Sequence, residues 1–227
     1  VIGNFSCGPD SFIMKYFKEE LRGKPYLHIE IDEHSADAGV ITRCEAFLDS
    51  IGHRNDGHRE QPLRKSRSAG ASLKDRVVYI PPMSDHAHAL AATFERFGVR
   101  SEVLPESDRE SLELGMHYVS GKECYPCALT TGDMMKKVNS RGFDASRSAF
   151  MMPSGSGPCR FGQYHVFHRM VLDHAGLVEV PIFSPNQDSG LFSSLEQVRG
   201  GFVTTAWKGI LAVDLLTKCL HETRPYE

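Results

Sequence analysis

The sequence has no apolar run of the roughly 18 to 20 residues that a membrane-spanning helix needs. Its N-terminus also lacks the basic, apolar and small-residue order of a signal peptide. Charge of one sign is not in excess, because the formal net charge is -3 and the isoelectric point is near 6.4. The overall charge therefore predicts neither a nucleic acid nor an anionic membrane as a partner. We expect a cytoplasmic protein without these partners.

Cysteine is also scarce. Six cysteines in 227 residues are too few for a disulfide scaffold, and the cytosol keeps thiols reduced. Metal binding or catalysis is the expected use of such cysteines.

The remaining composition is that of an ordinary folded domain. Hydrophobic residues make up 41% of the chain and charged residues 24%, which excludes a disordered, collagenous or coiled-coil protein. The chain begins at Val1 in what reads as the end of a strand, so we expect a fragment of a longer polypeptide.

Apolar periodicity predicts strands that alternate with helices of about ten to fifteen residues, which indicates an α/β fold with mostly parallel sheets and flanking helices. The predicted strands cover residues 1–5, 26–31, 77–80, 100–104, 148–152 and 177–183. The predicted helices cover residues 11–21, 37–48, 85–97, 108–119 and 124–138, a stretch from Cys159 through 174, and most of 192–221.

This pattern divides the chain into four parts. Residues 1–51 have too few strands for a sheet of their own and read as the C-terminal part of a first α/β half. Residues 52–75 carry six Lys or Arg against three Asp or Glu and hardly any apolar side chains, which is typical of a basic linker or exposed loop. Residues 76–190 are predicted to form a second α/β domain, and residues 191–227 C-terminal helices.

Four cysteines share one kind of setting. Cys7 and Cys159 follow predicted strands and lead into helices, and Cys124 and Cys127 open a helix. In open α/β sheets, ligands bind outside the carboxyl ends of the strands, where helix N-termini present free N–H groups and a positive dipole end. Glycine and proline beside each cysteine allow close backbone approach and stiffen the turns. The sequence therefore predicts a metal centre on these four thiols.

The spacing of the four cysteines bears on the kind of metal. A Cys-x-x-Cys motif occurs in zinc ribbons and in thioredoxin-like redox sites, but Cys7 and Cys159 are isolated, 117 and 32 residues away from the pair Cys124/Cys127. Such a dispersed set suits a cluster held between two halves, and we expect an iron–sulfur cluster of the [4Fe–4S] type. A structural zinc-binding interaction domain and a Cys124/Cys127 thiol redox protein remain as alternatives.

The last two cysteines, Cys44 and Cys219, lie in predicted amphipathic helices, where we expect small core residues.

Five further residues are candidates to face a ligand. Asp32 and His34 follow a predicted strand, although helix-capping carboxylates explain such a cluster equally well. His86 also follows a strand, where a helix-start role is favoured, and Asn186 lies beyond the last predicted strand. Arg160, beside Cys159, would offset the negative charge of a thiolate-bound cluster.

One histidine pair is predicted to have no functional role. His165 and His168 are one helical turn apart, and for them a solvated helix face is favoured over metal binding.

Four segments resemble the acyl-CoA dehydratase activase-related proteins, large polypeptides of anaerobes, and the similarity extends over almost the whole chain. The segments are residues 4–12 (NFSCGPDSF), 28–39 (HIEIDEHSADAG), 121–127 (GKECYPC) and 153–164 (PSGSGPCRFGQY).

In that family, ATPase activator domains are joined to a region similar to the 2-hydroxyacyl-CoA dehydratase subunits, whose α/β domains hold an iron–sulfur cluster. The resemblance implies a module for low-potential electron transfer, gated by ATPase activator domains in the same longer polypeptide or in a separate subunit, with a small-molecule or acyl-CoA-like substrate. The sequence has no nucleotide-binding motif of its own, because Gly155-Ser156-Gly157 lacks the Gly-Lys-Ser/Thr of a P-loop.

Overall fold

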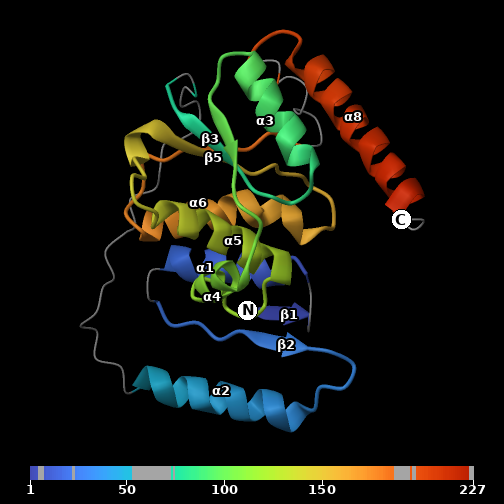
Figure 1. The fold of residues 1–227 in the computed structure, drawn as a ribbon. Coiled ribbons are helices and arrows are strands. Elements are labelled where there is room, and N and C mark those ends of the chain that lie inside the picture. Colours follow the sequence, from blue (N-terminus) through green and yellow to red (C-terminus); the bar gives the residue numbers. More distant parts are fainter. Residues whose placement is uncertain are drawn as a thin grey trace. The chain divides into compact units, whose positions relative to one another are not determined.

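The computed structural model describes residues 1–4, 8–21, 24–52, 73, 75–186, 195 and 198–224. The chain divides into two units, one made of Val1–Leu63 with Pro158–Arg160 and the other of Arg64–Gly157 with Phe161–Glu227 (Figure 1). Each unit has its own parallel sheet. Most of the predicted basic linker, residues 52–75, lies outside the described residues.

The first unit contains a β-α-β element. β1 (Ile2–Asn4) pairs in parallel with β2 (Ile29–Ile31), and α1 (Asp10–Leu21) connects them. Parallel neighbours need such a crossover, because a tight hairpin joins only antiparallel strands. Phe12 of α1 is fully buried, whereas no residue of the following helix, α2 (Asp37–Gly52), is buried. Both strands lie inside the predicted ranges, and β2 is shorter than its prediction.

The second unit is built on a four-stranded parallel sheet in the order β4-β3-β5-β6. Its strands are β3 (Val77–Ile80), β4 (Ser101–Val103), β5 (Ser148–Met151) and β6 (Ile182–Phe183). Its helices include α3 (His86–Arg96), α4 (Arg109–Met116), α5 (Tyr125–Val138), α6 (Tyr164–His174) and α8 (Phe202–Thr223). The predicted α/β class, with parallel sheets, flanking helices and a helical C-terminal segment, is therefore confirmed.

A hydrophobic core joins this sheet to α3 and α8. Val78 of β3, Ala149 of β5 and Phe94 of α3 are fully buried. The rings of Phe94 and Phe202 pack edge to face with their centroids 4.9 Å apart, so the first turn of α8 is anchored beside α3 (Figure 1). Among the described residues, no helix combines the length and the apolar character needed to cross a membrane.

The prediction of a strand over 177–183 is wrong for most of its length. Only Ile182 and Phe183 pair with β5. The guanidinium of Arg169 donates to the carbonyl oxygens of Leu177, at 2.8 Å, and of Val180. The amide of Val180 also donates to the carbonyl of Leu177, at 3.2 Å. Residues 177–180 therefore form a turn that a side chain of α6 holds, and the strand begins only after it.

Candidate metal centre

The sheet of the second unit has a topological switch point between β3 and β5. From β3 the chain goes on to β4 on one side, whereas β5 joins β3 on the other side. In open α/β sheets, ligands bind at such a point, outside the carboxyl ends of the strands. Residues 81–85 follow the carboxyl end of β3, and residues 152–157 follow that of β5. Both segments lead toward candidate residues, His86 and Cys159.

Cys124 and Cys127 lie at the N-terminal end of α5. Cys124 is the N-cap residue, with φ -71° and ψ 151°, and Pro126 lies in the first turn. The amide nitrogen of Cys127 donates to the carbonyl oxygen of Cys124 at 2.9 Å. Because α5 leads into β5, this end of the helix lies toward the carboxyl edge of the sheet. The positive end of the helix dipole favours anionic sulfur there.

The two sulfur-bearing side chains differ in burial. Cys127 is fully buried, whereas Cys124 is half-buried. The helix that the sequence predicts from Cys124 to residue 138 is confirmed, since α5 ends at Val138.

Tyr164 provides the polar contact to this pair. Its hydroxyl oxygen lies 2.6 Å from Sγ of Cys124, and its side chain is 3% exposed. Tyr164 is the first residue of α6, so the N-terminal ends of α5 and α6 meet at this hydrogen bond. The sequence analysis assigned no role to Tyr164, because nothing in the local pattern predicts a contact between residues 40 positions apart.

Behind this contact, His168 of α6 is buried, which makes the prediction of a solvated face wrong for that residue. Its side chain is 3% exposed, and Nε2 lies 3.3 Å from Oγ1 of Thr130 on α5. Burial lowers the pKa of His168 to about 3, so the imidazole is neutral at physiological pH. Burial also lowers the pKa of the half-buried His165. His168 contributes to the packing of α5 against α6.

Cys159 lies in the segment that Pro158–Arg160 adds to the first unit, and it is exposed. It does not lead directly into an α-helix as expected, since a 3₁₀ turn from Arg160 to Gln163 precedes α6. The Arg160 side chain passes beside Gly8, where an added Cβ would lie 3.5 Å from Cγ of Arg160. Gly8 follows Cys7 in the chain, and Cys7 itself lies outside the described residues.

The acidic cluster after β2 forms a capped turn. A carboxylate oxygen of Asp32 accepts hydrogen bonds from the backbone N–H of His34 at 3.0 Å and from the hydroxyl of Ser35 at 2.8 Å. The imidazole of His34 lies 3.8 Å from the carboxylate of Glu33, and both side chains are largely exposed. These contacts lie within the turn at residues 32–35, and a ligand-facing role for Asp32 and His34 stays a prediction.

His86 and Asn186 each follow a strand in the sequence, as expected. His86 begins α3, and its Nε2 lies 2.8 Å from a carboxylate oxygen of Asp214 on α8, while Nδ1 lies 3.2 Å from the hydroxyl of Ser84. Asn186 forms an isolated parallel bridge with Ser154. That bridge joins the segment after β6 to the segment after β5, beyond the carboxyl ends of these two strands.

Neither of the remaining cysteines is buried, so the expectation of core residues is wrong. Cys44 is half-buried in α2, and Cys219 is exposed on α8. Both helices have exposed apolar residues, which makes an amphipathic pattern a poor guide to burial here.

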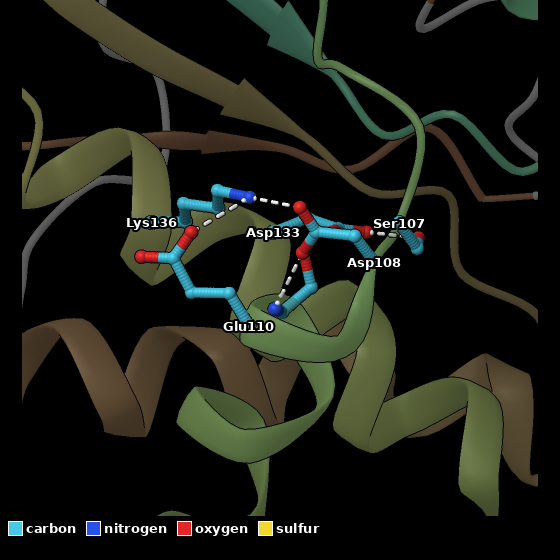
Figure 2. Close-up of polar contacts among 6 residues, drawn as sticks. Ser107, Asp108, Glu110, Asp133 and Lys136 are labelled. Atoms are coloured by element: carbon cyan, nitrogen blue, oxygen red, sulfur yellow. Dashed lines mark hydrogen bonds and ion pairs between the residues drawn. The ribbon is translucent and has the colours of Figure 1, made fainter.

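The side chain of Asp133 on α5 is buried, a feature that the sequence analysis did not find. It is 5% exposed, and the hydroxyl of Ser107 donates to its Oδ2 at 2.7 Å (Figure 2). Burial raises the pKa of Asp133 above its ordinary value. The nearest sequence signal is an aspartate on the otherwise uncharged stretch 124–135 of a helix.

One turn further along α5, Lys136 connects that helix to the start of α4. Its Nζ lies 2.5 Å from Oδ2 of Asp108 and 3.0 Å from Oε2 of Glu110 (Figure 2). Asp108 caps α4 by accepting from the N–H of Ser111 at 2.9 Å. The hydrogen bond from Lys136 lowers the pKa of Asp108 to about 2. These contacts hold the C-terminal part of α5 against the start of α4, at the end of the helix opposite to the two cysteines.

The donor set at the end of α5 fits a thiolate-bound metal. Two cysteines lie within one helical turn at a helix N-terminus, a tyrosine hydroxyl lies within hydrogen-bond distance of one sulfur, and the nearby histidine is neutral. Within the described part of the chain, no group of three or more His, Cys, Asp or Glu side chains is arranged to hold a metal ion. The pair therefore needs further ligands to complete a centre.

Comparison of the chain with protein-family models, with curated proteins and with solved structures gives no significant match.

Proposed function

We propose that this chain is an iron–sulfur cluster-binding electron-transfer module of a system related to the acyl-CoA dehydratase activases. Cys7, Cys124, Cys127 and Cys159 provide the four thiolates, and the cluster is of the [4Fe–4S] type. The observation that carries the proposal is the placement of Cys124 and Cys127 at the N-terminal end of α5, toward the carboxyl edge of a parallel sheet.

Each element near the pair has a definable task in this proposal. The N-terminal end of α5 presents the positive end of its dipole to anionic sulfur, and Tyr164 adds a hydroxyl at Sγ of Cys124. Arg160, beside Cys159 in the sequence, is a cation that offsets the negative charge of the thiolates. When bound, the cluster supplies one-electron transfer at low potential.

Partners follow from the resemblance and from the sequence. As the resemblance implies, the module receives its electron from ATPase activator domains, in the same longer polypeptide or in a separate subunit. A small-molecule or acyl-CoA-like substrate is the proposed acceptor.

The test is a panel of cysteine variants prepared without oxygen. Each of the four proposed ligands is replaced singly by serine, and iron, acid-labile sulfide and visible absorption are measured per chain. Cys44→Ser and Cys219→Ser are the matched controls, one in each unit of the chain. We expect every ligand variant to lose iron and absorption and both controls to retain them.

Two results would overturn the proposal. Stoichiometric zinc that survives air, without iron or sulfide, would indicate a structural zinc site. Normal iron content in Cys7→Ser or Cys159→Ser would remove these residues from the ligand set.

A thiol redox protein is the second candidate, and one observation favours it. Cys124 and Cys127 belong to the same unit and to one helix end, where the amide of Cys127 donates to the carbonyl of Cys124, as in Cys-x-x-Cys redox sites. This candidate predicts a reversible disulfide between the two residues that is unaffected by Cys7→Ser and Cys159→Ser. Thiol titration after mild oxidation separates it from the cluster proposal.

A further inference from the structure

We infer that Tyr164 is a positioning residue of the centre, which donates a hydrogen bond to the sulfur of Cys124 and raises the reduction potential of the cluster. The inference rests on the proposed function and adds a determinant of the potential to it. It starts from one contact, the 2.6 Å between the Tyr164 hydroxyl oxygen and Sγ of Cys124.

The direction of the hydrogen bond follows from the chemistry of the sulfur. A cysteine that ligates a metal is a thiolate and carries no proton. The phenol has one O–H to donate, so in the metal-bound state the hydroxyl of Tyr164 must be the donor. Hydrogen bonds to an anionic acceptor are stronger than neutral ones, which makes this contact a substantial influence on the sulfur.

Its neighbours hold the Tyr164 ring in place. The side chain is 3% exposed, and its ring packs edge to face on Phe161 with centroids 5.4 Å apart. On the other side, the imidazole of His168 lies 6.4 Å from the ring, and this imidazole is itself in contact with Thr130 on α5. A donor fixed by packing requires little reorganisation when the charge of the cluster changes.

The expected effect on redox chemistry has a definite sign. In the redox step, the cluster gains one electron from an external low-potential one-electron donor, no bond is made or broken, and the phenol keeps its proton. The reduced cluster is the more negative, so a donor at sulfur stabilises it more than the oxidised form and raises the potential. Removal of the donor should therefore make the potential more negative.

The test is Tyr164→Phe in the full chain, reconstituted without oxygen and titrated with a low-potential mediator while the cluster signal is followed. We expect iron content close to that of the wild type and a change of about tenfold in the equilibrium between reduced and oxidised cluster, ~59 mV toward more negative potential. Tyr125→Phe is the matched control, because it deletes a phenol hydroxyl beside Cys124 from a side chain that is 60% exposed. Its potential should equal that of the wild type.

A second readout does not depend on iron. A double-mutant cycle of Tyr164→Phe and Cys124→Ala, measured by urea unfolding of the iron-free chain, should be non-additive if the two side chains are bonded. Additive effects would overturn the inference whatever the metal content.

The outcomes separate the inference from the proposed function. An unchanged potential in Tyr164→Phe, with iron still bound, overturns the inference and leaves the proposed function in place. Loss of iron from Tyr164→Phe alone, at unchanged folding stability, assigns the residue to metal retention and also overturns the inference. Absence of iron and sulfide from the wild type overturns the proposed function together with any effect on the potential of a cluster.

Discussion

Replacing Gly132 by alanine should separate α4 from α5 and destabilise the second unit. A Cβ at position 132 would lie 1.6 Å from the carbonyl oxygen of Ser111, and one at position 115 would lie 1.9 Å from the carbonyl oxygen of Ala128. Both obstacles are backbone atoms, so no side-chain rotation relieves them, and the two helices must move apart by roughly 1 Å or more. We expect a loss of about 3 kcal/mol, at the upper end of typical overpacking costs.

Urea unfolding followed by circular dichroism measures this loss, and a thermal scan should show a midpoint lower by about 6 to 12 °C at ~2 to 4 °C per kcal/mol for a chain of this size. Gly39→Ala is the matched control, because Gly39 lies in α2 and an added Cβ meets no atom within 4 Å there. Alanine should stabilise that helix by up to about 1 kcal/mol. Wild-type stability of Gly132→Ala would refute the close approach of α4 and α5.

Three further predictions concern the dependence of stability on pH, and urea titrations at a series of pH values test each of them. Burial raises the pKa of Asp133 above 3.8, so the stability that its protonated form contributes is full below pH 3.8 and is lost as pH rises through the pKa of the folded state. Asp133→Asn should remove this loss of stability with rising pH. If the loss persists in the variant, another group causes it. Burial lowers the pKa of His168 to about 3, so the free energy of unfolding should decline as pH falls below 6.5, because His168 is protonated there in the unfolded chain and not in the folded one. His168→Gln should flatten this decline. An equally steep pH profile in the variant would contradict the burial of His168. The hydrogen bond from Lys136 lowers the pKa of Asp108 to about 2, so the stability that the Asp108 carboxylate contributes is full above pH 3.8 and is lost as pH falls through about 2. Asp108→Asn should be less stable than the wild type at neutral pH and equal to it in strong acid. Equal stability of variant and wild type at neutral pH and in strong acid would exclude a role for this carboxylate.

Local sequence signals were sufficient for most of the secondary structure of the second unit. The β-branched and aromatic run Val77–Ile80 follows a polar segment, and Gly98 has a positive φ of 82° after the end of α3, so these strand and helix boundaries were readable from residue chemistry. The Cys-x-x-Cys with its proline marked the start of α5, because proline is favoured in the first helical turn.

Contacts between distant residues could not be read in this way. Most of the strand predicted at 177–183 is instead a turn, in which the carbonyl of Leu177 accepts from the amide of Val180 and from Arg169 on another element. The burial of His168 depends on how α6 packs against α5, whereas its sequence spacing from His165 equally suits a solvated face.

In the candidate site, too, local sequence signals predicted the helix start and missed a contact between distant residues. Sequence placed Cys124 and Cys127 at a helix N-terminus, and that placement follows from local residue types. The hydroxyl that Tyr164 presents to Cys124 comes from a separate helix and depends on the crossover topology around β5. Polar contacts between side chains on separate helices can be identified only from the three-dimensional structure.

Acid-labile sulfide in the anaerobically isolated wild-type chain is the most direct test of the central claim, because a zinc site and a dithiol contain none. The proposed [4Fe–4S] centre predicts about four sulfides and about four irons per chain. A chain that folds, retains its thiols and contains neither iron nor labile sulfide after anaerobic preparation and reconstitution would contradict the claim.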